Sequence, residues 1–381
     1  WSRTATDVGN QTRSVLDRAK AEGGWAATAL ATSRALHERS RHTGGNGALM
    51  RTAPVALAYL EDDEDALVIA AREISALTHF DPDAQDACVL WCCAIRHAVL
   101  TGELDVRVGL SRLDEDRRAT WAERLDLAEA SQPADIPNNG WVVAALQAAW
   151  SAIVVTDTGE GRRAEHLTRG LDAAVRSGND TDTVAAIAGG LLGATYGASA
   201  VPGSWRRLMH GWPGLWARDL VALTNRIIGA DGDFPRPVGP RIAQQHPYDE
   251  GVWLGNAAAL LDPPDGVDAI VSMCRVHDDD LPAGVEQIDV RLIDRDGPES
   301  NPNLDFVLTD TVELIDRLRS EGRTVLVHCH GAYSRTPTVG ALYGALVCRA
   351  GMEESLAAVL EVLPGANPNP GFRSALKHLA S

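Results

Sequence analysis

Residues 325–336 read Val-Leu-Val-His-Cys-His-Gly-Ala-Tyr-Ser-Arg-Thr. The apolar residues ahead of Cys329 predict a short buried strand. An apolar, Ala/Leu-rich helix follows Arg335, and Pro337 lies near its first position, where proline is tolerated. A strand, a tight loop and a helix N-terminus together form a cup of backbone N–H groups. Such a cup binds a tetrahedral oxyanion and also favours a thiolate at its base.

Five residues separate Cys329 from Arg335, whose planar guanidinium can hold two phosphate oxygens. This spacing, after a strand and before a helix, resembles the phosphate loop of the cysteine-dependent protein tyrosine and dual-specificity phosphatases. The resemblance implies that Cys329 attacks phosphorus and forms a phosphocysteine, while Arg335 holds the transferring group. It also implies that Thr336 helps to release the intermediate and that His328 orients the loop. The alternative is a buried structural cysteine with an unrelated arginine.

The remaining loop residues would line or border the phosphate pocket, namely Gly331, Ala332, Tyr333 and Ser334. His330 is expected to be a specificity or surface residue rather than a proton carrier. The phosphatase family usually has glycine where this chain has Ala332. If that position requires a positive φ, alanine strains the loop. A loop that binds phosphate without turning it over is therefore a second hypothesis.

A general acid should lie upstream of the loop, because in the phosphatase family an aspartate on a separate loop protonates the leaving oxygen. Residues 288–293 alternate like a strand. Asp294 follows them directly and matches the family's placement, with Asp296 as the second candidate. The alternative is that both are solvated turn residues.

Composition limits the kind of protein. The chain has 381 residues, more than one hydrophobic core normally serves, so two domains are expected. Its formal charge of −17 argues against nucleic-acid backbones as a bulk partner. No apolar run is long enough to span a bilayer, so no membrane partner is expected. The six cysteines show neither a disulfide framework nor zinc spacing, which favours a reducing, cytoplasmic setting. Because the chain starts at Trp1 rather than Met, the natural N-terminus is expected upstream.

The pattern of apolar residues divides the chain. Residues 1–228 are predicted to be an all-α domain, with helices at 12–20, 25–36, 54–60, 63–76, 83–100, 141–153, 164–177, 183–197 and 215–228. Residues 229–250 are predicted to contain the linker, since the Pro- and Gly-rich run 231–240 cannot be helical. Residues 251–381 alternate strands (251–255, 268–274, 288–293 and 324–327) with helices (257–261, 304–320 and 353–363), and 364–372 is a predicted loop. This predicts an α/β domain like that of the phosphatases.

Residues 177–183 read Ser-Gly-Asn-Asp-Thr-Asp-Thr and precede an apolar, glycine-rich helix. Asp180 and Asp182 can both point at one hard cation, because the chain between them is not yet helical. Thr183 can add a hydroxyl oxygen. Oxygen-only ligation suits Mg²⁺ or Mn²⁺. The alternative is plain helix capping by Asp180 or Thr181.

This stretch resembles the second metal motif of the ADP-ribosylglycohydrolases. Other segments of 1–228 resemble that family in the same order: 7–12 (Asp-Val-Gly-Asn-Gln-Thr), 45–51 (Gly-Asn-Gly-Ala-Leu-Met-Arg), 78–79 (Thr-His) and 139–141 (Asn-Gly-Trp). The resemblance implies that four residues line an ADP-ribose pocket: Asp7, Asn46, Gly47 and His79. It also implies a binuclear Mg²⁺ or Mn²⁺ site that binds ribose hydroxyls and positions water. The alternatives are a helix cap for Asp7, a satisfied core histidine for His79 and a simple turn for 45–51.

Together the two resemblances predict a bifunctional hydrolase. The first domain would cleave ADP-ribose from a modified protein or small molecule in a metal-dependent reaction. The second would hydrolyse a phosphorylated substrate. The first metal motif of the family, a Thr-Asp-Asp-Thr segment, is absent from the six residues before Asp7. Weak or absent glycohydrolase activity is therefore expected from this chain. The alternative is a protein that binds ADP-ribose or phosphate with one or both sites inactive.

Overall fold

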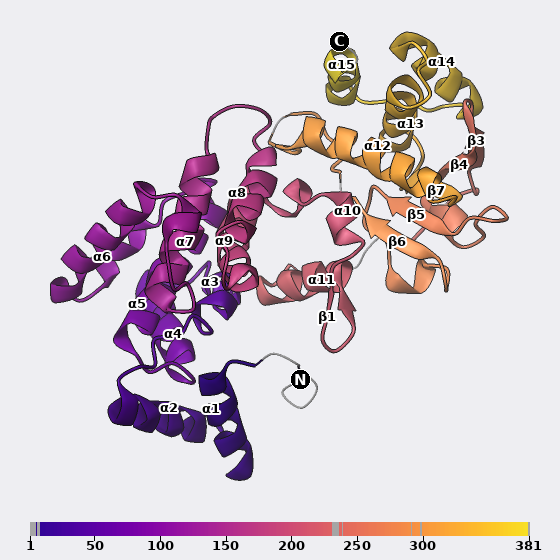
Figure 1. The fold of residues 1–381 in the computed structure, drawn as a ribbon. Helices are drawn as coiled ribbons and strands as arrows, with labels where there is room; N and C mark the ends of the chain where they lie inside the picture. The colour runs from indigo at the N-terminus through magenta and orange to yellow at the C-terminus, as the bar shows by residue number, and fades with distance from the viewer. Residues whose placement is uncertain are drawn as a thin grey trace. The chain divides into compact units, whose positions relative to one another are not determined.

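The structure is a computed structural model that describes residues 5, 8–230, 236–237, 239–290, 292–297 and 299–379. The chain forms two compact units, each with its own core (Figure 1). The first comprises residues 1–198 and 223–230, and the second comprises residues 199–222 and 231–381.

The first unit is built from helices. Their bounds are α1 Asn10–Ala21, α2 Ala26–Ser40, α3 Ala53–Ala58, α4 Glu64–Ala76, α5 Pro82–Thr101, α6 Glu115–Glu129, α7 Val142–Thr156, α8 Glu165–Val175 and α9 Thr181–Tyr196. Helix α11 (Ala217–Ile227) crosses from one unit's residues to the other's. Helices α5 and α7 lie at the centre of the first unit, because most of their residues are apolar and buried. Both pack against α9, so the helix that follows the predicted metal stretch is held centrally.

Two elements of this half of the chain escaped the sequence pattern. Helix α6 buries only Trp121, Leu125 and Ala128, and charged residues dominate the rest of it. Its apolar stripe is too narrow to produce a clear helical pattern. Residues 215–216 were predicted as the start of a helix, but they pair with 210–211 in a short antiparallel hairpin, β1 (His210–Gly211) and β2 (Leu215–Trp216).

The second unit contains a five-stranded sheet with the order β3-β4-β7-β5-β6. The strands are β3 Ala243–His246, β4 Asp249–Asn256, β5 Ala269–Ser272, β6 Glu286–Asp289 and β7 Val325–Cys329. β3 pairs with β4 antiparallel, and the other pairs are parallel. Every residue of β7 is buried, as a central parallel strand requires when both of its faces are covered. The sheet confirms the predicted α/β class of this half.

Helices α12 (Leu304–Ser320), α13 (Arg335–Leu346), α14 (Met352–Val362) and α15 (Pro370–Leu379) complete the second unit (Figure 1). α12 and α13 both contact β7. The short 3₁₀ helix Ala257–Leu260 joins a separate cluster of the core around Ile270 and Leu326. The predicted bounds of α12 are confirmed. Helix α15 was missed, because the Pro/Asn/Gly stretch read as a loop supplies its first three residues, beginning with Pro370, where proline is tolerated.

The observed division differs from the predicted domain bounds in two places. Residues 199–222 belong to the second unit, although the helical pattern included them in the first domain. Residues 243–246 form strand β3, although they fall within the predicted linker. β3 lies at an edge of the sheet and exposes Gln244 and Gln245, so no alternating apolar pattern marks it. The Pro- and Gly-rich core of the predicted linker, residues 231–235, lies outside the described residues.

Residues 199–207, called the strap below, pack on α12 and on strand β6 through the short helix α10 (Gly203–Arg206). The backbone N–H of Gly203 donates to the Asp310 carboxylate at 2.9 Å. Burial raises the pKa of Asp310, and this hydrogen bond acts in the opposite direction. A Cβ on Gly203 would lie 2.9 Å from Leu314 Cδ2, so the strap approaches α12 as closely as glycine allows.

Two arginines fix the other side of the strap. Arg206 donates to the backbone carbonyl of Asp289 at 2.6 Å, and so covers the edge of β6. Arg207 forms ion pairs with Glu286 at 2.7 Å and with Glu321 at 2.8 Å. These contacts tie the strap to two elements of the second unit at once.

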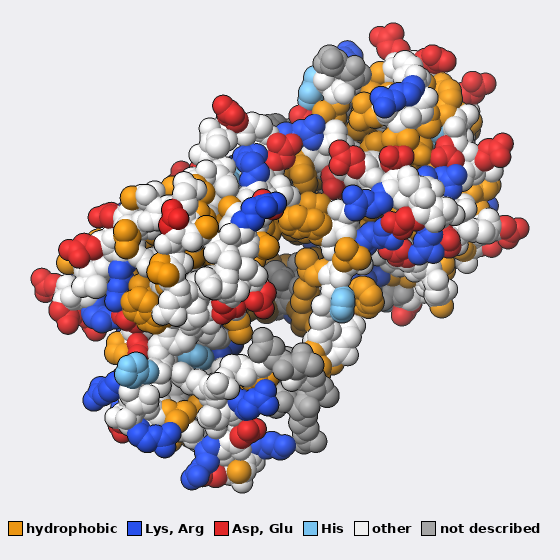
Figure 2. Space-filling view, viewed as in Figure 1, with side chains coloured by type: hydrophobic (Ala, Val, Ile, Leu, Met, Phe, Trp, Pro, Cys, Tyr) orange, Lys and Arg blue, Asp and Glu red, His pale blue; other side chains and the backbone are white. Residues whose placement is uncertain are grey.

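The described residues include no helix that combines the length and the apolar character needed to cross a bilayer. Figure 2 shows acidic and basic side chains interspersed over the visible face. Arg323 and Glu286 form one pair of opposite charges, at 2.8 Å.

Candidate active sites

The first candidate site begins where β7 ends, at Cys329, in the middle of the sheet. The loop that follows is held from outside by its carbonyl groups. The His330 carbonyl accepts from the Ala257 N–H at 3.1 Å, and the Tyr333 carbonyl accepts from the Asn367 N–H at 2.7 Å. In a trans peptide the carbonyl and the next N–H point in opposite directions. The N–H groups that follow these two carbonyls therefore point away from Ala257 and Asn367.

His328 lies directly before the cysteine and is fully buried. One ring nitrogen, Nε2, lies 2.7 Å from the Ser272 hydroxyl on the neighbouring strand β5. Burial lowers the pKa of His328 to about 4, while a hydrogen bond to the Cys329 carbonyl opposes the shift and the charge of Arg335 adds to it. The imidazole is therefore neutral near pH 7 and serves as a fixed support beneath the loop.

Arg335 opens helix α13, and its guanidinium is held on one side by carbonyl groups. Nη1 donates to the carbonyls of Met273 at 3.0 Å and Leu292 at 2.9 Å. Nε lies 3.7 Å from a carboxylate oxygen of Asp294, the predicted general acid. The other carboxylate oxygen accepts from the Asn369 side chain at 3.0 Å. The structure thus brings the predicted arginine and the predicted acid together.

Three further residues, Ala332, Ser334 and Thr336, shape the loop and the start of α13. Ala332 has φ of 54°, in the left-handed region that favours glycine, and it is buried. This is the strain that the sequence comparison with the phosphatase loop anticipated. The Thr336 hydroxyl donates to the Gly255 carbonyl at 3.1 Å, which ties the start of α13 to strand β4. Ser334 is buried, and its hydroxyl accepts from the Asn369 N–H at 3.1 Å.

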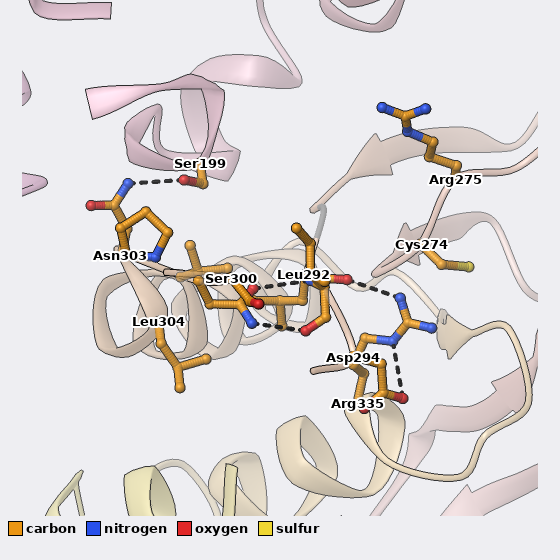
Figure 3. Close-up of a pocket in the computed structure, with 13 residues that line it drawn as sticks. Ser199, Cys274, Arg275, Leu292, Asp294, Ser300, Asn303, Leu304 and Arg335 are labelled. Carbon is orange, nitrogen blue, oxygen red and sulfur yellow. Dashed lines mark hydrogen bonds and ion pairs between the residues drawn. The ribbon is translucent and has the colours of Figure 1, made fainter. Parts of the chain in front are cut away.

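A hollow of about 430 Å³ adjoins Arg335 and Asp294 (Figure 3). It is lined by residues from the strap, from the segment after β5, from the segment after β6, and from the start of α12 with the residues just before it: Ser199, Cys274, Arg275, Leu292, Ile293, Ser300, Asn301, Pro302, Asn303, Leu304 and Val307. Sequence reading missed all of these residues as site residues. No motif marks them, because they come from four separate segments that only the fold assembles.

The second candidate site lies in the first unit, around Asn46. Its Nδ2 donates to the Asp180 carboxylate at 2.6 Å and to the backbone carbonyl of Asn139 at 2.8 Å. The side chain of Asn139 accepts from the Asp180 N–H at 3.0 Å and donates to the Gly178 carbonyl at 2.8 Å. Three segments that are far apart in the sequence therefore meet at Asp180, through its carboxylate and its backbone N–H. Asn139 was quoted only as part of a loop, and its role in holding Asp180 was missed.

His79 lies beside the glycines of the 45–51 loop. A Cβ on Gly45 or Gly47 would come within 3.3 Å of its ring, so both glycines allow the close approach. Nδ1 lies 2.7 Å from the Thr78 hydroxyl. Burial lowers the pKa of His79 to about 3, and the charge of Arg51 adds to the shift. Arg51 itself donates to Thr78, so the histidine and arginine are joined through one hydroxyl.

The residues predicted to bind metal are only partly arranged for it. The Asp180 carboxylate is bonded to Asn46, and the Thr183 hydroxyl points to Met50 Sδ at 3.7 Å. Asp182 is exposed. Within the described part of the chain, no group of three or more His, Cys, Asp or Glu residues could hold a metal ion. These residues do not make a complete metal site. Asp7 lies outside the described residues.

The N-terminal part of the chain matches a known protein family. A family model described as ADP-ribosylglycohydrolase matches residues 1–233, more than half of the chain. The chain belongs to the ADP-ribosylglycohydrolase family. One relative in this region is the ADP-ribosyl-(dinitrogen reductase) glycohydrolase of Rhodospirillum rubrum. It is 31% identical over 201 residues, which are 52% of this chain and 58% of that protein.

The C-terminal region of this family member is similar to dual-specificity phosphatases. The rat dual specificity protein phosphatase 15 is 34% identical over 128 residues, covering 33% of this chain and 53% of the relative. The crystal structure of human DUSP28 aligns with a TM-score of 0.33 and 24% identity, over 38% of this chain and 95% of that one. This chain spans about half the length of the curated relatives that it matches first. Both groups of relatives are hydrolases.

Proposed function

We propose that residues around Cys329 form a phosphatase site that acts through a phosphocysteine. The observation that carries the proposal is the pairing of Asp294 with Arg335 at 3.7 Å, where Arg335 begins α13 directly after the loop that follows Cys329 at the end of the central strand β7. In this proposal the Cys329 thiolate attacks phosphorus, and the bond from phosphorus to the leaving oxygen breaks. Arg335 turns its free edge to the phosphoryl oxygens, and Asp294 gives a proton to the leaving oxygen. Water then cleaves the sulfur–phosphorus bond, with Thr336 assisting the departure of the thiolate.

The supporting residues have positioning roles in this proposal. Neutral His328 fixes the last peptide of β7, and outward-facing carbonyls turn loop N–H groups toward the phosphate. Gly331, Ala332, Tyr333 and Ser334 form the wall of the cup. Asn369 holds Asp294 beside Arg335 through its hydrogen bond of 3.0 Å. Each of these roles depends on a contact or a backbone conformation that a single substitution would remove.

Hydrolysis of a generic aryl phosphate tests this function. Cys329→Ser should abolish turnover, because serine is a far weaker nucleophile than a thiolate. Cys348→Ser, at a half-buried cysteine outside the loop, is the matched control and should retain the wild-type rate. A wild-type rate no higher than that of Cys329→Ser would instead favour a loop that binds phosphate without chemistry.

We also propose that the Asn46 site binds ADP-ribose from a modified protein or small molecule. Membership of the ADP-ribosylglycohydrolase family and the contact of Asn46 with Asp180 support this. Gly47, His79 and Asp7 would border the same pocket. Asp180, Asp182 and Thr183 would supply part of a Mg²⁺ or Mn²⁺ site. A cytoplasmic location is part of the proposal, since a reactive thiolate needs reducing surroundings.

Calorimetry with ADP-ribose tests the second site. Asn46→Ala should weaken binding about fivefold or more, since it removes a buried amide that orders Asp180. Gln132→Ala, at an exposed polar residue, is the control and should bind like the wild type. Equal affinities of Asn46→Ala and the wild type would remove Asn46 from the pocket.

A further inference from the structure

The position of the hollow, next to Arg335 and Asp294, limits which part of a substrate can occupy it. A general acid must come within about 2.6–3.2 Å of the oxygen that it protonates. The leaving alcohol must therefore lie on the Asp294 side of the phosphate cup. Asp294 and Arg335 form one wall of the hollow of about 430 Å³. This volume falls within the range of small-molecule sites.

From this we propose that the hollow binds the leaving group of the phosphatase substrate, and that this group is a hydroxyl-rich small molecule such as a sugar. The inference rests on the proposed phosphatase function and adds the substrate class to it. It distinguishes a sugar phosphate from phosphotyrosine, which presents a flat aromatic ring.

The chemistry of the lining favours a sugar. Besides the charged Arg275, Asp294 and Arg335, its polar members are the hydroxyls of Ser199 and Ser300 and the amides of Asn301 and Asn303. Its apolar members are aliphatic, and none of the described lining residues is aromatic. A sugar ring presents C–H faces to aliphatic side chains and hydroxyls to amides and serines. A phenyl ring would find no aromatic partner there for edge or face contact.

The wall that carries the acid is held in place by Asn301. The Asn301 amide makes two hydrogen bonds with the backbone of Ile293, accepting from its N–H at 2.9 Å and donating to its carbonyl at 2.8 Å. Ile293 directly precedes Asp294. The paired bonds tie Asn301 to the residue directly before the acid, so Asp294 is positioned before a substrate arrives.

Ser199 lies in the strap and lines the hollow from a segment that precedes the five-stranded sheet in the sequence. Its hydroxyl accepts a hydrogen bond from Asn303 Nδ2 at 2.8 Å and retains a proton that it can donate. In Figure 3 the Ser199–Asn303 bond and the Arg335–Asp294 pair lie on opposite sides of the lining residues. Ser199 begins the strap, which Asp310, Asp289 and Glu286 hold on α12 and β6.

The strap belongs to the N-terminal part of the sequence but packs in the second unit. The family model for ADP-ribosylglycohydrolases extends to residue 233, so it includes the strap. The structure nevertheless packs residues 199–222 with the phosphatase-like unit. A residue from glycohydrolase-family sequence therefore contributes to the specificity of the other site. Ser199 is assigned as a specificity residue rather than a catalytic one.

Binding to the Cys329→Ser protein tests the substrate class without requiring turnover. The probes are ribose 5-phosphate, as a polyol phosphate, and phenyl phosphate, as a mimic of phosphotyrosine. Ribose 5-phosphate should bind about fivefold or more tightly than phenyl phosphate, which corresponds to one extra hydrogen bond. Adding Ser199→Ala should reduce the preference for ribose 5-phosphate about fivefold. Adding Ser374→Ala, at an exposed serine of α15, should leave the preference unchanged.

Two outcomes overturn the inference: tighter binding of phenyl phosphate, which would favour a phosphotyrosine protein as substrate, or a preference that Ser199→Ala does not change. Failure of the proposed function has a different signature. It appears as aryl phosphate hydrolysis that is no faster in the wild type than in Cys329→Ser, whichever probe binds better.

Discussion

His328 should make the second unit less stable as the pH falls, and Asn in its place should remove that dependence. The pKa of the buried imidazole is about 4, whereas an imidazole in the unfolded chain titrates near 6.5. Between these two values the unfolded chain binds a proton that the folded unit does not. The linkage therefore favours unfolding progressively as the pH falls through this window, and the contribution is absent above it.

The size of the effect follows from the two pKa values. Lowering the pH from about 7 to about 5 protonates almost all of the unfolded imidazole and only about a tenth of the folded one, which costs about 2 kcal/mol. Hydrogen exchange of the β7 and β5 amides reports the opening of this unit separately from the first one. The free-energy difference between wild type and His328→Asn should shift by about 2 kcal/mol over this pH range.

Ser272→Ala is the matched control for the cause of the shift. It removes the hydroxyl 2.7 Å from the ring and keeps the ring buried. Because burial is the leading cause of the lowered pKa, this variant should keep most of the pH dependence of the wild type. A pH dependence that is equal in wild type and His328→Asn would refute the reasoning.

Three other substitutions test separate parts of the structure. Ala332→Gly should relieve a left-handed conformation that costs alanine about 1 kcal/mol. Aryl phosphate turnover should rise if this strain limits the loop, and a fall in turnover would contradict that. Gly344→Ala should lower the free energy of opening of the second unit by about 1–3 kcal/mol, as measured by hydrogen exchange, because its new Cβ would overlap Ser355 Oγ. Unchanged stability would show that α13 and α14 separate easily. Asn139→Ala should lower the melting temperature of the first unit, because the Asp180 N–H and the Gly178 carbonyl lose hydrogen-bond partners worth about 1–3 kcal/mol. An unchanged melting curve would count against a structural role for the Asn139 amide.

The sequence was informative where one local stretch carries both structure and chemistry. The run that ends at Cys329 is apolar because β7 is buried on both faces, so its strand could be predicted. The carbonyl contacts of Arg335 could not, because they involve residues 43 and 62 positions away. Asp294 was predicted as the acid from its place after an alternating stretch, and the structure puts it beside Arg335.

The strap and the hollow could not be predicted because nothing local marks them. Residues 199–207 have no strong periodic pattern, and their packing depends on the partners Asp310 and Glu286, far along the chain. Helix α6 was missed because its buried stripe is narrow. Asn139 was visible as part of a motif, but only the fold shows that its amide holds Asp180. These features depend on tertiary contacts, which the spacing of apolar residues in the sequence does not reveal.

The most direct test of the central proposal is to quench the protein with acid during turnover of an aryl phosphate and to look for phosphate on its cysteines by mass spectrometry. We predict a phosphorylated peptide that contains Cys329 in the wild type, and its loss in Cys329→Ser. Sustained, Cys329-independent release of phosphate, with no phosphorylated Cys329 peptide, would contradict the account.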